Sequence, residues 1–414
     1  MEYETLIEDI FSRHPSVQVS GFGPKSYKAG LDAMREFDLK LGSPWRNYRI
    51  IHVAGTNGKG SVSSMLASCL AAQGLKVGLY TSPHLLDFRE RVKMVDSEGW
   101  AMVDKPYVQT FLEKHYSDIA SLSFFEITTG LAFSWFAEQK VDVAVIEVGL
   151  GGRLDSTNII DSELSIVTSI GLDHCALLGD TREQIASEKG GIFKNGAHAL
   201  VWGHDAQTDR VFEETALRVG AKLHFADELI PEAELQAYRP ESMDLRGEYQ
   251  QDNVRTVLAA LGLLGVKADA HAIEHTAERT GLRGRWEKLS DNPETICDIG
   301  HNPPALARNF AQLKESGRPL TIVYGVMADK ALDDIAPLMP SDADYILCAP
   351  KGNRALPVHE LHSRLAALRP ELRLDDATSV ADAVKIARSK SQIESIIYIG
   401  GSTFVVAEAL LLSN

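Results

Sequence analysis

Short apolar runs alternate along the chain with segments of helical periodicity. The runs at 50–54, 141–149 and 164–170 are rich in Val, Ile and Leu, and each leads into glycines or polar residues. Strands of this kind, buried on both faces and connected by helices, are typical of parallel sheets. Polar groups at the carboxyl ends of such strands gather at one edge of the sheet. The pattern therefore predicts an α/β fold with a doubly wound, mostly parallel sheet.

The alternation restarts after a glycine-containing segment at 281–285, which we interpret as a hinge. A chain of 414 residues exceeds what one hydrophobic core usually supports. We therefore expect two domains, 1–284 and a smaller Rossmann-like unit over 285–414. The first should open with an amphipathic segment around 6–11, a Gly/Pro turn at 21–24 and a helix over 31–41. Strands of the second are expected at 294–299, 320–324, 344–348 and 395–399, with helices at 303–315, 331–338, 357–368, 378–389 and 404–412.

Composition narrows the class of protein. The chain is 44% apolar and 24% charged, as in ordinary globular proteins, and its formal charge is −15 without a long Lys/Arg tract. An acidic surface argues against non-specific nucleic-acid or membrane binding. The four cysteines are far apart and form no C-x-x-C pair, and no apolar run is long enough to span a membrane. We expect a cytoplasmic protein.

The first strand leads into a glycine-rich turn, Gly55-Thr-Asn-Gly-Lys-Gly-Ser61, and then into a helix. The glycines allow backbone amides to converge on an anion near the helix N-terminus. Lys59 adds a charge for β- and γ-phosphates, and Ser61 adds a hydroxyl. The usual phosphate-loop pattern would place glycine at Val53 and Ser or Thr at Gly60. We interpret the stretch as a nucleotide-binding loop, and the alternative is a glycine-rich turn with a solvated lysine.

Other polar residues follow strand ends. Glu147 ends an apolar strand and precedes a glycine-rich segment, which suits a carboxylate that holds Mg²⁺, although it also suits a simple strand cap. His174 follows another strand end and is either a ligand or a structural histidine. Lys189 on its own reads as a last-turn lysine that complements a helix dipole. Asp298 and His301 belong to a βα turn where N-capping explains part of the pattern. By spacing alone, Asn253 and Arg285 carry no signal.

These motifs together resemble the folylpolyglutamate synthase/dihydrofolate synthase family, within the Mur-type amide ligases, over nearly the whole chain. The family's own loop reads G-T-N-G-K-G-S, which accounts for the irregular phosphate loop. Arg283 departs from the family, which usually has proline before Gly284-Arg285. The motifs are Gly55–Ser61, Thr81-Ser-Pro-His-Leu85, Phe124-Phe-Glu126, Glu147–Asp155, Gly171-Leu-Asp-His174, Glu188–Lys194, Gly284-Arg285, Asp298–Pro303 and Gly401-Ser402.

The resemblance implies roles for these residues. Ser82 and Glu147 would bind one Mg²⁺ and His174 a second, while Lys189 would carry a carbamate (N6-carboxylysine) beside the metal. Lys59, His174 and Lys189 would be catalytic, and His301 and Ser402 would bind the incoming glutamate. ATP would be contacted by Gly55, Thr56, Asn57, Gly58, Lys59, Gly60, Ser61, Asn253, Arg285 and Asp298. The pterin site would be lined by Ser123, Phe124, Phe125, Glu126, Arg153, Leu154 and Asp155.

The resemblance also implies an activity, the ATP-dependent addition of L-glutamate to dihydropteroate, to the glutamate tail of reduced folates, or to both, through an acyl phosphate. The segment Phe124-Phe-Glu126 resembles that of bacterial enzymes with both activities, so we expect a bifunctional enzyme. Its partners would be these small molecules and ATP, not nucleic acid or membrane, and we expect a monomer. One alternative is a muramyl-peptide ligase, although fewer than fifty residues precede the first strand. The other is a nucleotide-gated binding module.

Overall fold

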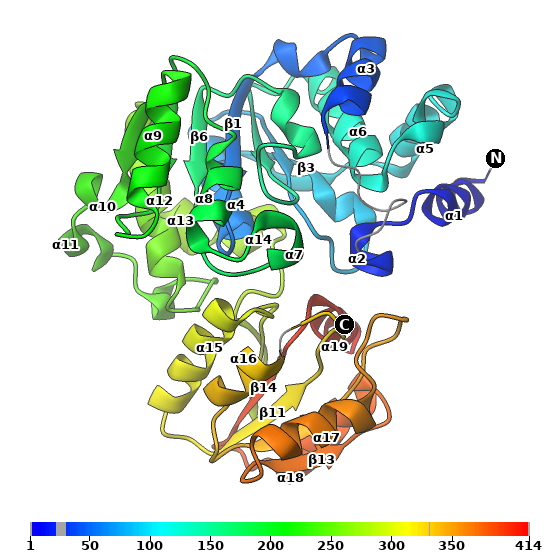
Figure 1. Ribbon diagram of the computed structural model, residues 1–414, viewed down its shortest axis with the longest axis vertical. Coiled ribbons are helices and arrows are strands. Elements are labelled where there is room, and N and C mark those ends of the chain that lie inside the picture. Colours follow the sequence, from blue (N-terminus) through cyan, green and yellow to red (C-terminus); the bar gives the residue numbers. More distant parts are fainter. Residues whose placement is uncertain (1, 22–29, 331, 413–414) are drawn as a thin grey trace. The chain divides into compact units, whose positions relative to one another are not determined.

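Two mostly parallel sheets organise the protein, one in each of its two units (Figure 1). The computed structural model describes residues 2–21, 30–330 and 332–412. Unit 1 comprises Met1–Met243 and Gln250–Leu282, and unit 2 comprises Asp244–Tyr249 and Arg283–Asn414. Each unit has its own buried core.

The sheet of unit 1 has the order β4-β3-β2-β5-β1-β6-β7-β8. Its neighbours pair in parallel except at β2–β3 and β3–β4, which are antiparallel. The order reverses direction around β1, which lies between β5 and β6, so the loop after β1 emerges at a topological switch point where ligands bind in such folds. The strands are β1 (Arg49–Ala54), β2 (Val77–Tyr80), β3 (Val92–Asp96), β4 (Gly99–Met102), β5 (Val143–Glu147), β6 (Leu164–Val167), β7 (His198–Val201) and β8 (Lys222–Phe225).

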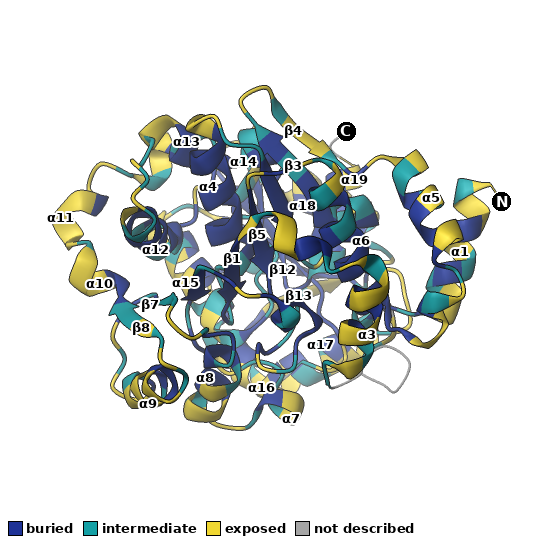
Figure 2. Ribbon diagram, turned by 90° about the horizontal axis from the view of Figure 1, so that it is seen from above, coloured by how far each residue is buried: buried dark blue, intermediate teal, exposed yellow. Residues whose placement is uncertain are grey.

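Helices cover both faces of this sheet. Residues of α6, α8 and α9 pack with alternate residues of the strands on one face, while α4 and α12 contact the strands from the other. Almost all of α4 is buried because α12, α13 and α14 cover it in turn (Figure 2). The helices are α1 (Tyr3–Arg13), α2 (Val17–Ser20), α3 (Asp32–Leu41), α4 (Lys59–Ala72), α5 (Lys105–Lys114), α6 (Phe124–Glu138), α7 (Cys175–Leu178), α8 (Arg182–Gly190), α9 (Asp209–Val219), α10 (Ala226–Leu229), α11 (Glu232–Leu235), α12 (Gln250–Leu263), α13 (Ala270–Glu274) and α14 (Thr276–Thr280).

Unit 2 has a sheet of order β13-β12-β11-β14-β10-β9, parallel except for β9. The short segment 244–249 belongs to it because the Glu248 amide donates to Gln312 Oε1 at 3.0 Å and the Tyr249 hydroxyl donates to Asp298 Oδ2 at 2.6 Å. The elements are β9 (Glu287–Asp291), β10 (Glu294–Cys297), α15 (Pro303–Glu315), β11 (Leu320–Tyr324), α16 (Leu332–Ile335), β12 (Asp344–Leu347), α17 (Val358–Leu368), β13 (Arg373–Asp376), α18 (Val380–Lys390), β14 (Ile396–Gly400) and α19 (Thr403–Leu411).

The structure confirms the α/β class with a mostly parallel sheet. The hairpin β3–β4 and the strands β9 and β13 were not predicted, because they lie at sheet edges and because β3, β9 and β13 contain charged residues that interrupt the apolar pattern. Most of the Gly/Pro turn expected at 21–24 lies outside the described residues. Within the described part of the chain, a search for helices with the length and apolar character needed to cross a membrane finds none.

Candidate functional site

The segment Gly55–Ser61 connects β1 to α4 as the strand–turn–helix that a phosphate loop requires. Gly55 has φ of 150° and Gly58 has φ of 91°. A Cβ at Gly55 would lie 1.7 Å from Thr168 Oγ1, and one at Gly58 would lie 2.3 Å from Asn253 Oδ1. Neither position can accept a side chain, because both the backbone conformation and the close neighbours exclude it.

The N-terminus of α4 suits an anion. This helix has 14 residues, and its N-cap residue is Gly58, which has no side chain to bond the first-turn amides. Such amides and the helix dipole favour a phosphate group. Gly171, which lies outside the loop, fixes its conformation. The Thr56 hydroxyl donates to the Gly171 carbonyl at 3.1 Å, and the Gly171 amide donates to the Thr56 hydroxyl oxygen at 3.0 Å. The residues present therefore fit a nucleotide phosphate.

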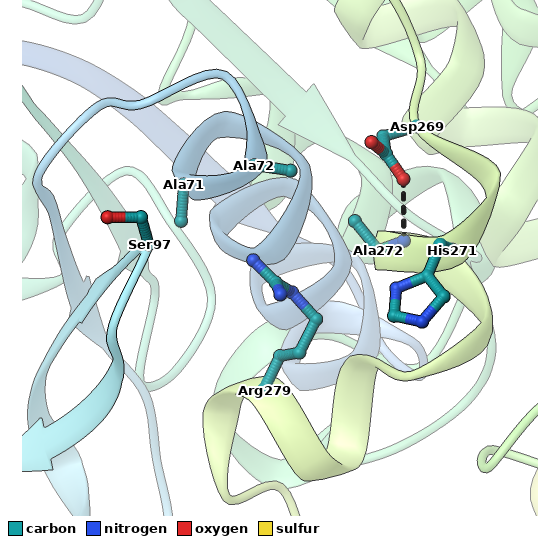
Figure 3. Close-up of a pocket in the computed structure, with 7 residues that line it drawn as sticks. All are labelled: Ala71, Ala72, Ser97, Asp269, His271, Ala272 and Arg279. Atoms are coloured by element: carbon teal, nitrogen blue, oxygen red, sulfur yellow. Dashed lines mark hydrogen bonds between the residues drawn. The ribbon is translucent and has the colours of Figure 1, made fainter.

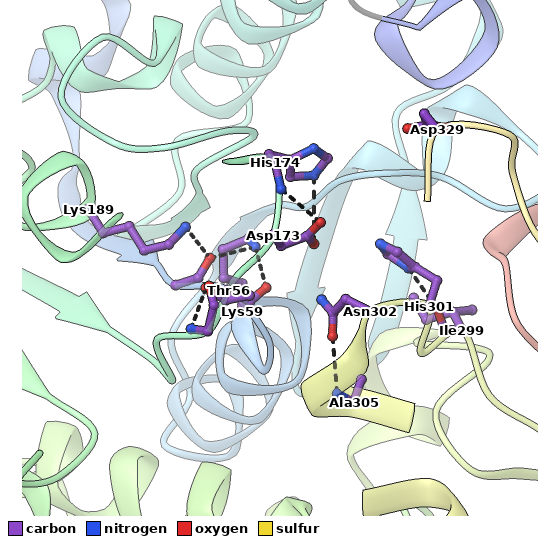
Figure 4. A network of polar contacts seen from close by, with 12 residues as sticks. Thr56, Lys59, Asp173, His174, Lys189, Ile299, His301, Asn302, Ala305 and Asp329 are labelled. Carbon is purple, nitrogen blue, oxygen red and sulfur yellow. Dashed lines mark hydrogen bonds and ion pairs between the residues drawn. The ribbon is translucent and has the colours of Figure 1, made fainter. Parts of the chain in front are cut away.

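Two lysines, Lys59 and Lys189, meet at the carbonyl of Gly55, and both of their side chains are labelled in Figure 4. Lys59 Nζ donates to Gly55 O at 2.9 Å and to Thr56 O at 3.1 Å, and Lys189 Nζ donates to Gly55 O at 2.8 Å. Lys189 is only 4% exposed. Burial, with a further contribution from the charge of Lys59, lowers the pKa of Lys189 to about 7. A substantial fraction of this amine is therefore neutral, and thus nucleophilic, near neutral pH.

Oxygen donors suited to Mg²⁺ lie beside the loop. Glu147 ends β5, and its Oε2 accepts the amide of Ser82 at 3.0 Å, so the sheet edge brings these two residues together. His174 has left-handed backbone geometry, with φ of 54°, and its Nε2 lies 3.8 Å from Asp173 Oδ2 (Figure 4). Among the described residues, no three His, Cys, Asp or Glu side chains are grouped closely enough to hold a metal by themselves.

Gln250 is a residue that the sequence analysis missed. It is fully buried, its Nε2 donates to Ser61 Oγ at 3.1 Å, and its Oε1 accepts from Asn253 Nδ2 at 2.7 Å. The side chain thus links the phosphate loop to Asn253, which was expected to contact ATP. No local pattern marks it, because its partner Ser61 is distant in the sequence.

The start of α6 holds several residues expected in the pterin site. Ser123 and Glu126 form a capping box, in which Glu126 Oε2 accepts the Ser123 amide at 2.6 Å and hydroxyl at 2.7 Å. The S-x-x-E spacing is the sequence signature of a capping box, so the capping role of these two residues could have been predicted from the sequence. Phe124 packs edge-on against Phe11 with ring centroids 5.1 Å apart. Phe125 lies against Gly149, where a Cβ would come within 2.4 Å of its ring.

A buried arginine accompanies Phe124, and the sequence analysis missed it as well. Arg91 is 4% exposed, its guanidinium carbon lies 5.2 Å from the centroid of the Phe124 ring, and its Nε donates to His84 Nδ1 at 2.8 Å. Burial and the charge of Arg91 lower the pKa of His84 to about 3, so the imidazole is neutral and accepts this hydrogen bond. The proline-containing loop 81–91 thus contributes a buried cation next to an aromatic face.

The segment after β5 contains Arg153, Leu154 and Asp155. Arg153 is exposed and forms an ion pair with Glu188 at 2.7 Å, and Leu154 is partly buried. Asp155 is buried, and its carboxylate accepts hydrogen bonds from the Thr157 amide at 3.0 Å, the Thr157 hydroxyl at 2.5 Å and the Leu150 amide at 2.9 Å. Burial raises its pKa despite these bonds. The carboxylate fixes the glycine-rich segment that follows β5.

In unit 2 the expected residues are also engaged in their own fold. Asp298 accepts hydrogen bonds from the Gly300 amide at 2.7 Å, Asn309 Nδ2 at 2.8 Å, the Trp286 amide at 2.8 Å and the Tyr249 hydroxyl. His301, Ser402 and Arg285 make local contacts. His301 Nδ1 lies 3.0 Å from Ile299 O (Figure 4), and Ser402 Oγ accepts the Val405 amide at 3.2 Å. Arg285 Nη1 donates to Arg283 O at 3.1 Å.

A separate hollow of about 440 Å³ lies at the other end of α4 (Figure 3). The helix begins at Lys59 and the hollow touches Ala71 and Ala72, so about 20 Å of helix separates it from the phosphate loop. It contains none of the residues expected to bind a ligand. Its lining is Ala71, Ala72, Ser97, Asp269, His271, Ala272 and Arg279.

Comparison with known proteins gives two domain matches and several full-length relatives. Residues 53–260 match the Mur ligase middle domain, and residues 284–403 match the Mur ligase glutamate ligase domain. The chain is 31% identical to the dihydrofolate synthase/folylpolyglutamate synthase of Bacillus subtilis, over 92% of this chain and 94% of that protein. This relative is named for folate synthesis, which disfavours the muramyl-peptide alternative.

Two solved structures are similar over nearly their full length. Escherichia coli FolC in complex with DHPP and ADP has 28% identity and a TM-score of 0.82, covering 99% of this chain and 97% of that one. The bifunctional folylpolyglutamate synthase/dihydrofolate synthase of Yersinia pestis, complexed with AMPPNP and a Mn ion, has 28% identity and a TM-score of 0.80, covering 94% and 95%. The chain therefore belongs to the dihydrofolate synthase/folylpolyglutamate synthase family of ATP-dependent ligases within the Mur ligases, which confirms the family indicated by its motifs.

Proposed function

We propose that this protein catalyses both glutamate additions of its family, to dihydropteroate and to the glutamate tail of reduced folates. The observation that most supports ligase chemistry is the meeting of Lys59 and Lys189 at the Gly55 carbonyl, beside an uncapped helix N-terminus. A simple nucleotide switch has no need of a second, buried lysine at its phosphate loop. The similar structures are complexes with DHPP and ADP and with AMPPNP and a Mn ion, which supports a nucleotide and a divalent metal as ligands here.

The nucleotide would be held in unit 1 by Gly55–Ser61 and Asn253. ATP and Mg²⁺, when bound, supply the phosphoryl group that activates the acceptor carboxylate and neutralise charge as two anions meet. The side chain of Lys59 lies against the loop, bonded to Gly55 O, and from there its ammonium can pair with the β- and γ-phosphates. Ser82 and Glu147 would hold one Mg²⁺ and His174 a second. We also propose that Arg285 and Asp298 contact the nucleotide.

Lys189 would act as a carbamate. Its neutral amine attacks the carbon of CO₂, so that a new N–C bond forms and one proton is released to solvent. The carbamate is an anion, whereas the unreacted lysine is a cation when protonated, so the modification removes the repulsion between Lys189 and Lys59 and would provide oxygen donors for a metal. The pKa of about 7 supports this step because only the neutral amine is nucleophilic.

The acceptor would lie against the start of α6 and the segment after β5. Phe124 and Phe125 offer aromatic faces for a pterin, and Glu126, Ser123, Arg153, Leu154 and Asp155 would complete the site. Arg91 adds a buried cation next to Phe124 and is a further candidate for the acceptor's negative charge. His301 and Ser402 would bind the incoming glutamate, whose amine displaces phosphate from the acyl phosphate.

The decisive experiment is a coupled assay of ADP and phosphate release with purified protein. Release should require L-glutamate and should occur with dihydropteroate and with tetrahydrofolate, and mass spectrometry should show each product heavier by one glutamate residue. Turnover with only one of the two acceptors would show that the enzyme is monofunctional. Turnover with neither would refute the proposal, and stimulation by a UDP-muramyl acceptor would support the muramyl-peptide alternative.

A further inference from the structure

A buried chain of hydrogen bonds leads from β1 to the carboxylate of Asp155. His52 Nε2 lies 2.8 Å from Thr157 Oγ1, and the same oxygen lies 2.5 Å from Asp155 Oδ1. His52 and Thr157 are completely buried, and Asp155 is 7% exposed. Hydrogen bonds in such surroundings are electrostatically stronger than in water. The orientation of the carboxylate is therefore coupled to a residue of the central strand.

The direction of each bond in this chain follows from the chemistry of the groups. Burial raises the pKa of Asp155, but its two oxygens accept the amides of Thr157 and Leu150 and the Thr157 hydroxyl, and a carboxylate that accepts all three has no proton to donate. The Thr157 hydroxyl therefore donates its single proton to Asp155, and its oxygen accepts from His52. This requires the proton of the imidazole to be on Nε2. Burial holds the pKa of His52 well below its usual range, so the ring is neutral and Nδ1 carries no proton.

Stability does not explain the histidine. His52 shares one face of β1 with Ile50 and lies beside Ile146 of β5, so its position belongs to an apolar core. Among the described residues, its Nδ1 has no hydrogen-bond partner. A buried acceptor left unpaired costs on the order of 1–3 kcal/mol, which an apolar side chain would avoid. The advantage of a histidine at this position must therefore come from the hydrogen bond between its Nε2 and Thr157 Oγ1.

We propose that His52 is a positioning residue for the acceptor site, which fixes the Thr157 hydroxyl and through it the carboxylate of Asp155. The Thr157 hydroxyl donates to Oδ1 of Asp155, and Oδ2 accepts the amide of Leu150 in the glycine-rich segment. The chain thus sets both the carboxylate and the backbone next to it. This inference rests on the proposed function, in which Asp155 belongs to the pterin site.

A pair of substitutions tests the role of the donor. His52→Met removes it while filling a similar volume, and His52→Gln retains an N–H donor at the place of Nε2. The Met variant should raise the KM for dihydropteroate roughly three- to tenfold, as expected for one lost hydrogen bond, with a KM for ATP close to that of the wild type. The Gln variant should restore most of the acceptor affinity. Thr157→Val removes the hydroxyl that accepts from His52, and Thr157→Ser keeps it, so the two variants repeat the comparison at the other partner of this hydrogen bond.

Further variants separate positioning from general stability. Adding His52→Met to Thr157→Val should not raise the acceptor KM further, because both changes break one chain. Thr276→Val deletes a buried hydroxyl in α14, which bonds Ile273 O at 2.9 Å, and should leave the acceptor KM unchanged. If the variants only lower the unfolding temperature and leave the acceptor KM unchanged, the inference is wrong and the proposed function stands. If the wild type uses neither acceptor, both are wrong.

Discussion

Several side chains expected to bind ligands also hold their own surroundings in place. Ser123 and Glu126 cap α6, Ser402 caps α19, and Asp298 accepts four hydrogen bonds within unit 2. Groups fixed in this way are pre-organised for a ligand, which helps binding and catalysis. Their replacement changes both the site and the local fold. Kinetic effects of such variants therefore have meaning only alongside a measurement of stability.

Lys189 shows why some functional residues are invisible to local patterns. By spacing it is an ordinary last-turn lysine of α8, yet its partner Gly55 lies 134 positions earlier in the chain. His52 is similar, because in the sequence it only interrupts an apolar run, and Gln250 lies in a polar stretch that gives no sign of its contact with Ser61. The phosphate loop, in contrast, could be predicted because its glycines, lysine and serine lie within seven positions. The resemblance of the motifs to a known family, and not their periodicity, pointed to Lys189.

The carbamate at Lys189 can be detected with ¹³C-labelled CO₂. We expect a carbamate carbonyl signal in the NMR spectrum of the wild type that is lost in Lys189→Ala. The signal should grow as the pH rises from about 6 to about 8, because deprotonation of an amine with a pKa near 7 produces the nucleophile. Ligase activity of the Ala variant should fall by roughly 100-fold or more if a metal-binding group is lost, and acetate should restore part of it.

A matched control for this experiment is Lys194→Ala. Lys194 is also partly buried with a pKa lowered by burial, but its Nζ bonds Asn158 Oδ1 at 3.0 Å, away from the phosphate loop. Its removal should leave the labelled signal intact. A signal that persists without Lys189, or an active Lys189→Ala variant that acetate does not affect, would contradict the carbamate.

At the scale of elements, the buried interior strands could be predicted from the sequence, whereas the hairpin β3–β4 and the edge strands β9 and β13 could not. β5 and β11 are buried along their length, β1 is buried after Arg49, and all three are mainly apolar, whereas β3 has Lys93 and Asp96 beside its apolar residues. The edge strands β9 and β13 are rich in charged residues, as is common at sheet edges, so their sequences resemble loops. The charge at Lys93 has a structural reason that appears only in three dimensions. Its Nζ donates to Thr280 O at 2.8 Å and to Gly281 O at 3.4 Å, at the C-terminus of α14.

Replacement of this buried lysine should therefore destabilise unit 1 without touching the chemistry. Lys93→Met retains the packing of the side chain but leaves helix carbonyls without their donor, and we expect a loss of about 1–3 kcal/mol. Urea denaturation followed by tryptophan fluorescence would measure it. Lys105→Met is the control, because its ion pair with Glu4 is 48% and 67% exposed and should contribute about 0.5 kcal/mol or less. Equal effects of the two substitutions would contradict a capping role for Lys93.

At the scale of the whole molecule, the protein is acidic although its proposed ligands are anions. The formal charge is −15, yet two lysines are concentrated at one carbonyl of the phosphate loop. Net charge therefore could not predict the site, because the positive charges at the phosphate loop are local. The division into units was also only partly readable, because no sequence pattern assigns the segment 244–249 to unit 2. Its assignment depends on single tertiary contacts such as that of Tyr249 with Asp298.

A reciprocal pair of substitutions can test whether the two units are separate cooperative bodies. Tyr249→Phe removes the hydroxyl that bonds the buried Asp298, at a cost of about 1.5–3 kcal/mol for a hydrogen bond to a charged group. Tyr48→Phe removes a hydroxyl that bonds Phe133 O at 3.2 Å in unit 1, at a cost of about 1 kcal/mol. Amide hydrogen exchange measured on peptides should rise in β10 and β14 for the first variant and in β1 and α6 for the second. Exchange that rises equally in both units for either variant would show that they unfold as one body, because a single cooperative unit shares every loss of stability.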